Sequence, residues 1–285
     1  MHLIDVRDVY KIYNPGENQV NALDGVSLTI DEGEFVAIIG QSGSGKSTLM
    51  NMLGLLDVPT SGEYYINGNL VEDLTDDQMS VIRNEQIGFI FQGFNLISSL
   101  TAVENVELPL VYRGMGRQER REIAEKALAR VGLDKRMHHL PAEMSGGQQQ
   151  RVAVARAIAA APPVILADEP TGNLDEKNEK IVLDLFRQLH EQGTTVIVVT
   201  HDALVASCAQ REIMLNHGVL VGEKWNDKNA RDAYVAAGGK PASTGSDAEG
   251  AQHGDSSIDF IDPTKAAKTG GDLSLIHISE PTRQE

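Results

Sequence analysis

One short segment, Gly40 to Thr48, constrains the fold of this chain more than any other. It matches the pattern G-x-x-x-x-G-K-[ST], and it lies between an apolar run, Phe35 to Ile39, and a helix-like stretch, Thr48 to Leu56. A phosphate-binding loop requires this strand–loop–helix context. Its glycines let the backbone approach a polyphosphate, and the N–H groups of the loop and of the helix N-terminus then point at the anion. The segment, called the phosphate loop below, predicts an α/β fold that binds a nucleoside triphosphate.

The residue types in the phosphate loop have separate chemical roles. Lys46 is expected to reach the β- and γ-phosphates, and the Ser47 hydroxyl is expected to bind Mg²⁺. A Gly/Ser-rich turn with a chance lysine would not explain the strand before the loop and the helix after it. The residues expected to surround the phosphates are Gly40, Ser42, Gly43, Ser44, Gly45, Lys46, Ser47 and Thr48.

A second apolar run, Val164 to Ala167, ends in two carboxylates, Asp168 and Glu169. The run is entered through two prolines and has the length of a buried strand in a parallel sheet. At its carboxyl end, Asp168 can hold Mg²⁺ directly or through water, and Glu169 can act as the general base toward an attacking water. Alone the pattern is weak, because many strands end in solvated acids. Together with the phosphate loop it predicts hydrolysis of the triphosphate.

A third motif, Met144 to Arg151, lies between these two in the sequence. Ser145 and Gln148 have the spacing of a helix capping box. Gly146 and Gly147 leave the first helical turn bare, so its N–H groups are accessible to an anion. An ordinary capped helix in a Gln-rich loop is the alternative. A second anion-binding helix N-terminus, far from the first in sequence, favours a γ-phosphate held between two surfaces.

Taken in order, these motifs resemble those of the ATP-binding subunits of ABC transporters, over about residues 3 to 222. The segment Met144 to Gln148 resembles the family signature Leu-Ser-Gly-Gly-Gln, with Met in place of the first Leu, a mild apolar exchange. The resemblance implies ATP and Mg²⁺ as cofactors. It also implies that the nucleotide contacts Ser145, Gly146, Gly147, Gln148 and Asp175.

The resemblance assigns four further roles. It implies that Tyr13 stacks on adenine and that Gln92 senses Mg²⁺, the nucleophilic water and the membrane partner. It likewise places Asp175 in the D-loop and His201, the switch histidine, near the γ-phosphate. On local chemistry alone, Tyr13 could be a packing aromatic, Gln92 a polar strand end and His201 a structural histidine. The residues expected to act in catalysis are thus Glu169, His201 and Gln92. The residues expected to hold Mg²⁺ are Ser47, Gln92 and Asp168.

Composition and charge restrict the class of protein and its location. The chain has 285 residues, of which 41% are hydrophobic, enough for one sizeable core. A single cysteine, Cys208, excludes an internal disulfide framework and suits a reducing compartment. No apolar run approaches about 18 residues, and the N-terminus lacks the pattern of a signal peptide. A net charge of −16 argues against nonspecific binding to nucleic acid or anionic membranes. These features suit a cytosolic protein, and the resemblance implies a peripheral position on the cytoplasmic face of the plasma (inner) membrane, attached through a permease.

The pattern of elements predicts the architecture of an α/β P-loop NTPase with a parallel core sheet. Alternation in residues 3 to 33 and a hairpin Asn-Gly at 67–68 predict an N-terminal antiparallel β-subdomain. An inserted α-helical subdomain is expected over about 93–160. The remaining elements are expected at 163–167, 175–192 and 194–200, followed by a hairpin near 217–218.

Three regions follow from this reading. Residues 1–222 form the ATP-binding domain, and residues 223–272 are expected to be an acidic flexible tail or linker. Within this tail, Trp225, Tyr234 and Val235 could pack on the domain as a terminal helix. Residues 273–285 resemble an in-frame translation of a sequencing adapter, and we exclude them from functional reasoning as not native.

The resemblance implies a head-to-tail dimer in which each ATP lies between the phosphate loop of one copy and the Ser145 helix of the other. Leu55 to Gly62 and Thr171 to Asp175 resemble the branch that contains macrolide exporters, lipoprotein-release ATPases and antimicrobial-peptide exporters. That branch implies a permease with a large extracytoplasmic domain, and export or extraction of a peptide, drug or lipoprotein.

Other functions remain open at this point. One is a regulatory ATPase that acts through a membrane partner on cell-wall or cell-division machinery. A soluble ABC ATPase of DNA repair or translation is a distant third, because only a helical subdomain fits between Lys46 and Asp168. A simple kinase would leave the Ser145 to Gln148 motif unexplained.

Overall fold

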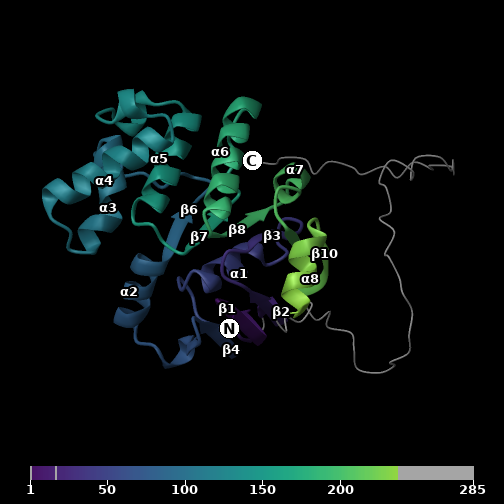
Figure 1. Ribbon diagram of the computed structural model, residues 1–285. Helices are drawn as coiled ribbons and strands as arrows, with labels where there is room; N and C mark the ends of the chain where they lie inside the picture. Colours follow the sequence, from purple (N-terminus) through teal and green to yellow (C-terminus); the bar gives the residue numbers. More distant parts are fainter. Residues whose placement is uncertain (1, 17, 237–285) are drawn as a thin grey trace, which may run out of the picture. The chain divides into compact units, whose positions relative to one another are not determined.

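A six-stranded sheet forms the centre of the computed structural model, which describes residues 2–16 and 18–236 (Figure 1). Its strand order is β10-β9-β3-β8-β7-β6, and every neighbouring pair is parallel except β9 with β10. The predicted parallel core sheet is confirmed, and the predicted last hairpin supplies its antiparallel edge. The strands are β3 (Phe35–Ile39), β6 (Ile87–Ile90), β7 (Val164–Asp168), β8 (Thr195–Thr200), β9 (Arg211–Asn216) and β10 (Val219–Trp225).

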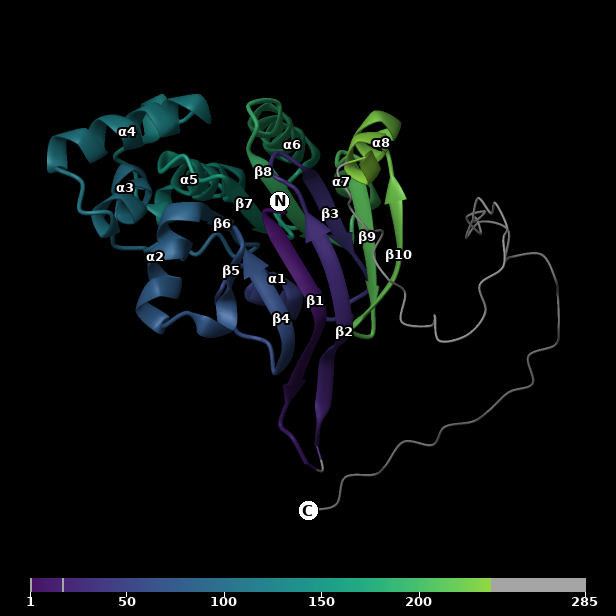
Figure 2. The same ribbon diagram turned by 60° about the horizontal axis from the view of Figure 1, so that its bottom comes forward.

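A second, antiparallel sheet has the strand order β2-β1-β4-β5. It consists of β1 (Ile4–Tyr13), β2 (Val20–Ile30), β4 (Ser61–Ile66) and β5 (Asn69–Leu70), and Figure 2 shows β1 and β2 as a long hairpin. Asn67 and Gly68 connect β4 to β5 with φ angles of 50° and 75°, as a tight hairpin turn requires. The antiparallel β-subdomain predicted from the sequence is therefore confirmed.

Helices cover both faces of the parallel sheet because successive side chains of its buried strands point to opposite sides. In β3, Phe35 and Ala37 pack with α5, α6 and α7, whereas Val36 and Ile38 pack with α1 and the antiparallel sheet. The helices are α1 (Lys46–Leu53), α2 (Asp76–Gln86), α3 (Ala102–Tyr112), α4 (Arg117–Arg130), α5 (Gly146–Ala159), α6 (Glu176–Glu191), α7 (Ala203–Ala206) and α8 (Lys228–Ala236), with short 3-10 turns at Val71–Asp73, Asp134–Arg136 and Pro141–Glu143.

Helices α3, α4 and α5 form one helical lobe (Figure 1). A capping box between Thr101 and Glu104 begins α3. The fully buried Asn105 amide donates to the main-chain oxygens of Ile97 and Leu100, so it orders the loop that leads from β6 into the lobe. Because α5 also packs on β6, the lobe is joined directly to the core sheet.

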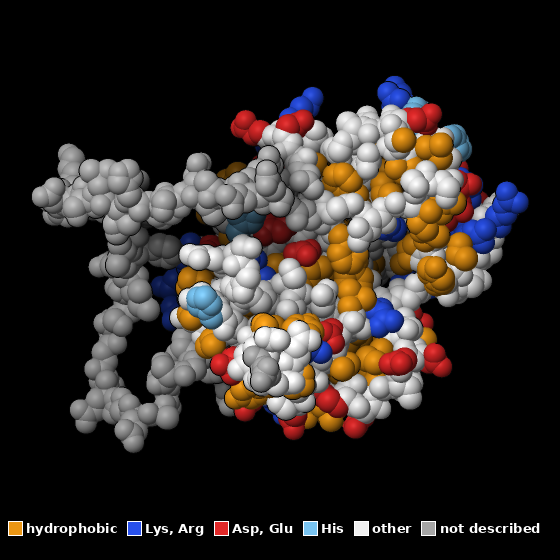
Figure 3. Space-filling view, turned by 180° about the vertical axis from the view of Figure 1, so that it is seen from behind, with side chains coloured by type: hydrophobic (Ala, Val, Ile, Leu, Met, Phe, Trp, Pro, Cys, Tyr) orange, Lys and Arg blue, Asp and Glu red, His pale blue; other side chains and the backbone are white. Residues whose placement is uncertain are grey.

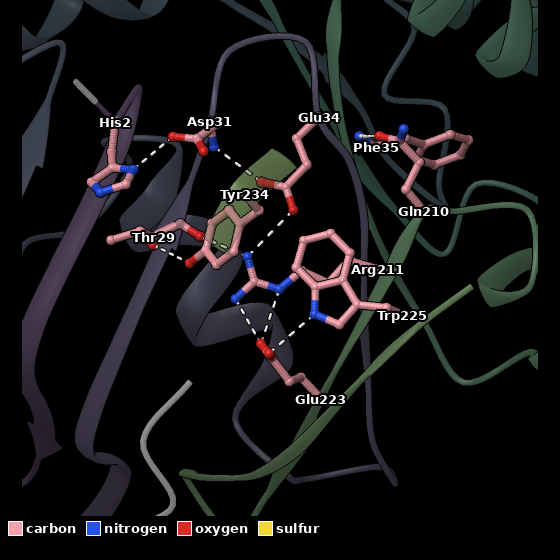
Figure 4. Close-up of polar contacts among 10 residues, drawn as sticks. All are labelled: His2, Thr29, Asp31, Glu34, Phe35, Gln210, Arg211, Glu223, Trp225 and Tyr234. Atoms are coloured by element: carbon pink, nitrogen blue, oxygen red, sulfur yellow. Dashed lines mark hydrogen bonds and ion pairs between the residues drawn. The ribbon is translucent and has the colours of Figure 1, made fainter. Parts of the chain in front are cut away.

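A buried arginine attaches helix α8 to the edge of the sheet (Figure 4). The Arg211 guanidinium donates to Glu223 Oε2 at 2.8 and 3.0 Å and to Glu34 Oε1 at 3.3 Å. Its central carbon lies 5.1 Å from the Trp225 ring and 4.6 Å from the Tyr234 ring, within cation–π range. Burial raises the pKa of Glu34, and the positive charge of Arg211 opposes that rise.

Strand β10 and helix α8 extend the folded chain past residue 222, where the sequence predicts a tail to begin. That boundary is too early, because Trp225 and Tyr234 supply aromatic faces for Arg211. The rest of the predicted tail and residues 273–285 lie outside the described residues, 237–285 being omitted. Within the described part of the chain, no helix has both the length and the apolar character to cross a membrane.

Replacing Arg211 by Met is expected to destabilise the fold by about 3–5 kcal/mol, because Glu34 and Glu223 would be left without their buried cation. Urea denaturation measures this loss. The control is Arg187→Met, which removes an exposed pair with Asp184 and is expected to cost less than about 1 kcal/mol. Equal losses in the two variants would contradict this account of the α8 attachment.

Candidate nucleotide-binding site

The predicted site residues from four separate segments line one cavity of about 840 Å³ at the carboxyl ends of β3, β7 and β8. Gln92, Asp168, Glu169 and His201 lie on its wall, although they are far apart in the sequence. The phosphate loop contributes Ser42, Gly43, Gly45, Lys46, Ser47 and Thr48 to the same wall. The chain therefore brings the predicted phosphate, metal and general-base residues together.

Two glycines of the phosphate loop are required by close packing. A Cβ atom on Gly40 would lie 2.2 Å from the Leu215 main-chain oxygen, and one on Gly45 would lie 2.4 Å from that of Ala22. Gly45 also has a φ of 100°, which favours glycine. The loop is thus wedged between β2 and β9, and any larger residue at these positions would displace it.

The phosphate loop holds donors without full internal partners. Helix α1 begins with no side-chain cap on its first turn, and Gly45 is its N-cap. The Ser44 hydroxyl is buried with no hydrogen-bond partner among the described residues. Lys46 Nζ donates to the main-chain oxygens of Gly40 at 2.7 Å and Gln41 at 2.9 Å. An anion in the cavity would satisfy the helix N-terminus and offer Lys46 a charged acceptor.

The environment of Asp168 in the cavity shifts the pKa of its carboxyl group. Burial raises the pKa of Asp168, the charge of Glu169 raises it further, and Lys46 lowers it. Its carboxylate accepts no hydrogen bond from residues 2–16 and 18–236, so it lacks the partners that usually stabilise a half-buried charge. A cation near Asp168 would stabilise the charged form of this carboxylate.

The predicted magnesium ligands fit the chemistry of that ion. Ser47, Gln92 and Asp168 border the same cavity and offer oxygen donors, which Mg²⁺ prefers. Within the described residues, no cluster of three or more His, Cys, Asp or Glu residues could hold a metal by itself. A magnesium ion here would therefore need phosphate oxygens and water to complete its coordination.

Glu169 is held in an unusual backbone conformation with both carboxylate oxygens engaged. Its φ is 42°, in the left-handed region that only a well-determined environment imposes on a residue other than glycine. Oε1 accepts from His201 Nδ1 at 2.7 Å, and Oε2 accepts from Thr200 Oγ1 at 3.0 Å. The Glu169 side chain is 16% exposed and that of His201 is 69% exposed. The predicted general base and the predicted switch histidine are thus in contact.

The predicted capping box at the start of α5 is confirmed. The Ser145 side chain accepts from the Gln148 N–H, and the Gln148 side chain accepts from the Ser145 N–H. The segment Ser145 to Gln148, called the signature segment below, does not border the cavity of its own chain. The two helix N-termini that the sequence predicts to bind anions are therefore not part of the same cavity.

The signature segment packs against the D-loop of the same chain. Asp175 is the N-cap of α6 and accepts from the Asn178 N–H at 2.8 Å, which lowers the pKa of Asp175. A Cβ atom on Gly147 would lie 2.3 Å from Asn178 Cγ, so a larger residue would have to displace the Asn178 side chain. This contact keeps Asp175 beside the signature segment, away from the cavity.

Tyr13 lies outside the cavity wall, at the end of β1. Its hydroxyl donates to Asp57 Oδ2 at 2.8 Å, and Lys11 Nζ lies 5.2 Å from its ring. The predicted adenine contact would therefore involve a ring whose hydroxyl is fixed by Asp57.

Sequence reasoning missed several residues of the cavity. Val20, Asn21 and Ala22 of β2 and His217 of the β9–β10 turn also line it. These residues belong to no sequence motif. They reach the cavity only because β2 and the β9–β10 turn pack against the phosphate loop. His217 could have been suspected from the adjacent hairpin signal alone.

Comparisons with known proteins agree with this geometry. The sequence profile described as "ABC transporter" matches residues 23–172. The macrolide export ATP-binding/permease protein MacB of Hyphomonas neptunium is 53% identical over 230 residues, which are 81% of this chain and 36% of that protein. The uncharacterized ABC transporter ATP-binding protein YknY of Bacillus subtilis is 48% identical over 219 residues, 77% of this chain and 95% of that protein. This chain spans about a third of the length of the MacB relatives.

Solved structures show the same fold. The ATP-binding cassette MJ0796, solved as a dimer in a post-hydrolysis state bound to ADP and Pi, has a TM-score of 0.75 and 48% identity to this chain. The match covers 79% of this chain and 99% of that one. A second dimeric structure of MJ0796, described as a bacterial ABC transporter cassette, is 49% identical with the same TM-score.

Replacing Asp168 by Asn tests the electrostatic cost of the site without nucleotide. A carboxyl group with a raised folded-state pKa destabilises the fold above that pKa, and the cost vanishes below the unfolded-state value of about 3.9. We therefore expect Asp168→Asn to raise the thermal unfolding midpoint at about pH 7, and the gain to shrink as the pH falls toward about 4.

The matched control is Asp175→Asn. The pKa of Asp175 is lowered, so its charge contributes stability that is present above about pH 3.9 and lost as the pH falls through the lowered value. This variant should not raise the unfolding midpoint. An unchanged or lower midpoint for Asp168→Asn at neutral pH would contradict the expected cost.

Proposed function

This chain belongs to the ABC transporter family and is an ATPase, and from that premise we propose that it drives a membrane permease through ATP-dependent dimer closure. The observation that carries the proposal is the convergence of the phosphate loop, Asp168, Glu169 and His201 on one cavity. A binding module without hydrolysis would not need an acidic side chain aligned beside a histidine at the phosphate end of the cavity.

The proposed hydrolysis uses groups already in place. Lys46 exchanges the main-chain oxygens of Gly40 and Gln41 for phosphate oxygens, and the uncapped turn of α1 binds the phosphates. Ser47, Gln92 and Asp168 would hold Mg²⁺, which would neutralise charge on the phosphates. The Glu169 carboxylate then takes the proton of the attacking water.

His201 is proposed to leave Glu169 when ATP arrives. Its Nδ1 contacts Glu169 Oε1 in the single chain, and its side chain is largely exposed, so it can turn toward a γ-phosphate without repacking the core. This movement frees Oε1 for water. The switch role predicted for His201 thus has a simple structural basis.

Two copies are proposed to complete each site. The signature segment does not border the cavity of its own chain, so we propose that the first turn of its helix contacts a nucleotide held by another chain in a head-to-tail dimer. The solved MJ0796 cassettes are dimers, which supports a dimer of this chain. ATP drives closure only through its higher affinity for the closed dimer, and hydrolysis removes that preference.

An apolar groove is the proposed docking site of the permease. It lies between α2, β6 and α3, where Leu56, Val81 and Tyr112 are exposed. Phe89 and Phe91 line it with stacked rings 5.5 Å apart. Figure 3 shows hydrophobic side chains on both sides of a hollow between the helical lobe and the rest of the molecule. An exposed apolar groove of this kind fits a helical segment of a protein partner.

Residues that line the groove lead both to the nucleotide cavity and to the helix that begins at the signature segment. Phe91 precedes Gln92, which borders the nucleotide cavity. Arg156 of α5 donates to the main-chain oxygens of Phe94 and Asn95, so the segment after Gln92 is tied to the helix that begins at the signature segment. A displacement of a permease segment in the groove would thereby reach the dimer interface.

The MacB relatives are named for macrolide export, which supports export as the transport task, and we propose a peptide, drug or lipoprotein as the substrate that is exported or extracted. We place the chain at the cytoplasmic face of the inner membrane, bound to a permease with a large extracytoplasmic domain. A regulatory ATPase would use the same site and groove, and ATPase activity that no transported substrate stimulates would identify it.

Lys46→Ala and Glu169→Gln are expected to separate binding from hydrolysis. Lys46→Ala removes the cation at the phosphates and should lower MgATP affinity by at least about tenfold. Glu169→Gln keeps the shape of the site and should preserve MgATP affinity while slowing turnover by about 10²- to 10⁴-fold. Equilibrium binding and phosphate release measure the two effects.

These variants also define what would refute the assignments. Unchanged MgATP affinity in Lys46→Ala would refute the phosphate-loop assignment. Rapid turnover by Glu169→Gln would refute the general-base assignment. Tyr112→Phe, a conservative change in the groove, serves as a control and should alter neither quantity.

The groove is tested with two valines of similar exposure. Val81 lies on α2 in the groove beside edge strand β6, and Val221 lies on the opposite edge strand, β10. Val81 in the groove is 54% exposed, and Val221 on β10 is 50% exposed. Val81→Glu should lose sedimentation with inner-membrane vesicles from the source cells, because a charge would be buried against the partner. Val221→Glu should sediment like the unmodified chain, and both variants should retain basal ATPase activity. Equal sedimentation of the two variants would exclude the groove as the docking site.

A further inference from the structure

Thr200 ends strand β8, and its side chain is almost fully buried beside Glu169. Thr200 is 1% exposed, and its Oγ1 lies 3.0 Å from Glu169 Oε2. The Asp202 N–H donates to the same Oγ1 at 3.0 Å. Because Oγ1 accepts from Asp202, its own proton is directed to the Glu169 carboxylate.

The end of β8 holds both the backbone and the side chain of Glu169. The Glu169 N–H donates to the Val199 main-chain oxygen at 2.8 Å, and the next residue, Thr200, donates to the carboxylate. Asp168 is the register partner of Val199 in the parallel sheet. Two consecutive residues of one strand thus fix a residue whose φ of 42° is otherwise unfavourable.

The two carboxylate oxygens of Glu169 have different partners. The partner of Oε1 is His201, whose side chain is exposed and can turn away, whereas the partner of Oε2 is a buried hydroxyl with no room to leave. When His201 leaves, Oε1 alone becomes available to a water. A carboxylate held at one oxygen keeps the orientation of the other.

We propose that Thr200 is a positioning residue, which aims Oε1 of Glu169 at the attacking water by holding Oε2. The proposal rests on the general-base role proposed above for Glu169. Thr200 itself touches neither nucleotide nor water in this account. Its hydroxyl acts only through Glu169, and the Asp202 N–H keeps that hydroxyl in the correct orientation.

Thr200→Val keeps the shape of the side chain and removes the hydroxyl. We expect kcat for ATP hydrolysis to fall by about tenfold to a hundredfold, the value of a lost hydrogen bond to a charged group, with MgATP affinity within about twofold. Thr200→Ser keeps the hydroxyl and should stay within about threefold of the unmodified kcat. Thr200→Cys, with a weaker donor, should fall between them. If Thr200→Val does not fold, the Ser and Cys variants make the same comparison.

A packing role would give a different pattern. If Thr200 acted only by packing, Thr200→Ser, which loses a buried methyl group, would have a lower unfolding midpoint. Its hydroxyl would then not restore kcat. Equal kcat in Thr200→Val and the unmodified protein, or equal losses in the Val and Ser variants, would overturn the proposal.

A double-mutant cycle separates this proposal from the general-base role. Because Thr200 acts through Glu169, adding Thr200→Val to Glu169→Gln should cause no further loss in single-turnover rate. A full further loss would show that Thr200 acts independently and would overturn the proposal. If Glu169→Gln is inactive and Thr200→Val is fully active, only the positioning role of Thr200 is refuted. If Glu169→Gln is active, the general-base role of Glu169 is refuted.

Discussion

Two pairings in the parallel sheet, Ile39 with Thr200 and Val199 with Asp168, determine the site. They set β3, β8 and β7 in register, so the segments that follow each strand leave the sheet at one edge. Parallel strands place their carboxyl ends together, and ligands of α/β sheets bind at that edge. The phosphate loop, the two acidic residues and His201 therefore meet at one edge of the sheet.

The same chain is incomplete in a specific way. Its cavity contains the groups proposed to bind phosphates and activate water, while the signature segment does not border that cavity and lies against Asn178. In the proposed function, a single copy can therefore bind ATP but cannot surround it. This separation makes a second copy part of the active site in the proposed function, and the groove beside Phe91 connects that dimer to a permease.

The sequence allowed the elements with local signals to be predicted. The loop between strand and helix, the Ser145 capping box and the Asn67 turn each depend on neighbouring residues, and all three are present. Cavity residues such as Val20 and Asn21 depend on packing between distant segments, so no local pattern marks them. The sequence indicated that Trp225 and Tyr234 could pack on the domain, but their shared partner Arg211 could be identified only from the structure.

The most direct test is the molar mass of Glu169→Gln with MgATP, measured by light scattering with and without Gly146→Glu. A Cβ atom on Gly146 would meet its nearest neighbours at 3.7 and 3.9 Å, and a carboxylate in the first helical turn is favourable, so the fold should accept this change. In a dimer its charge would face the γ-phosphate of the other copy. The account predicts a dimer for Glu169→Gln and an ATP-binding monomer for the double variant, with Gly146→Ala as the control. Dimers of equal stability in both would contradict a nucleotide held between two chains.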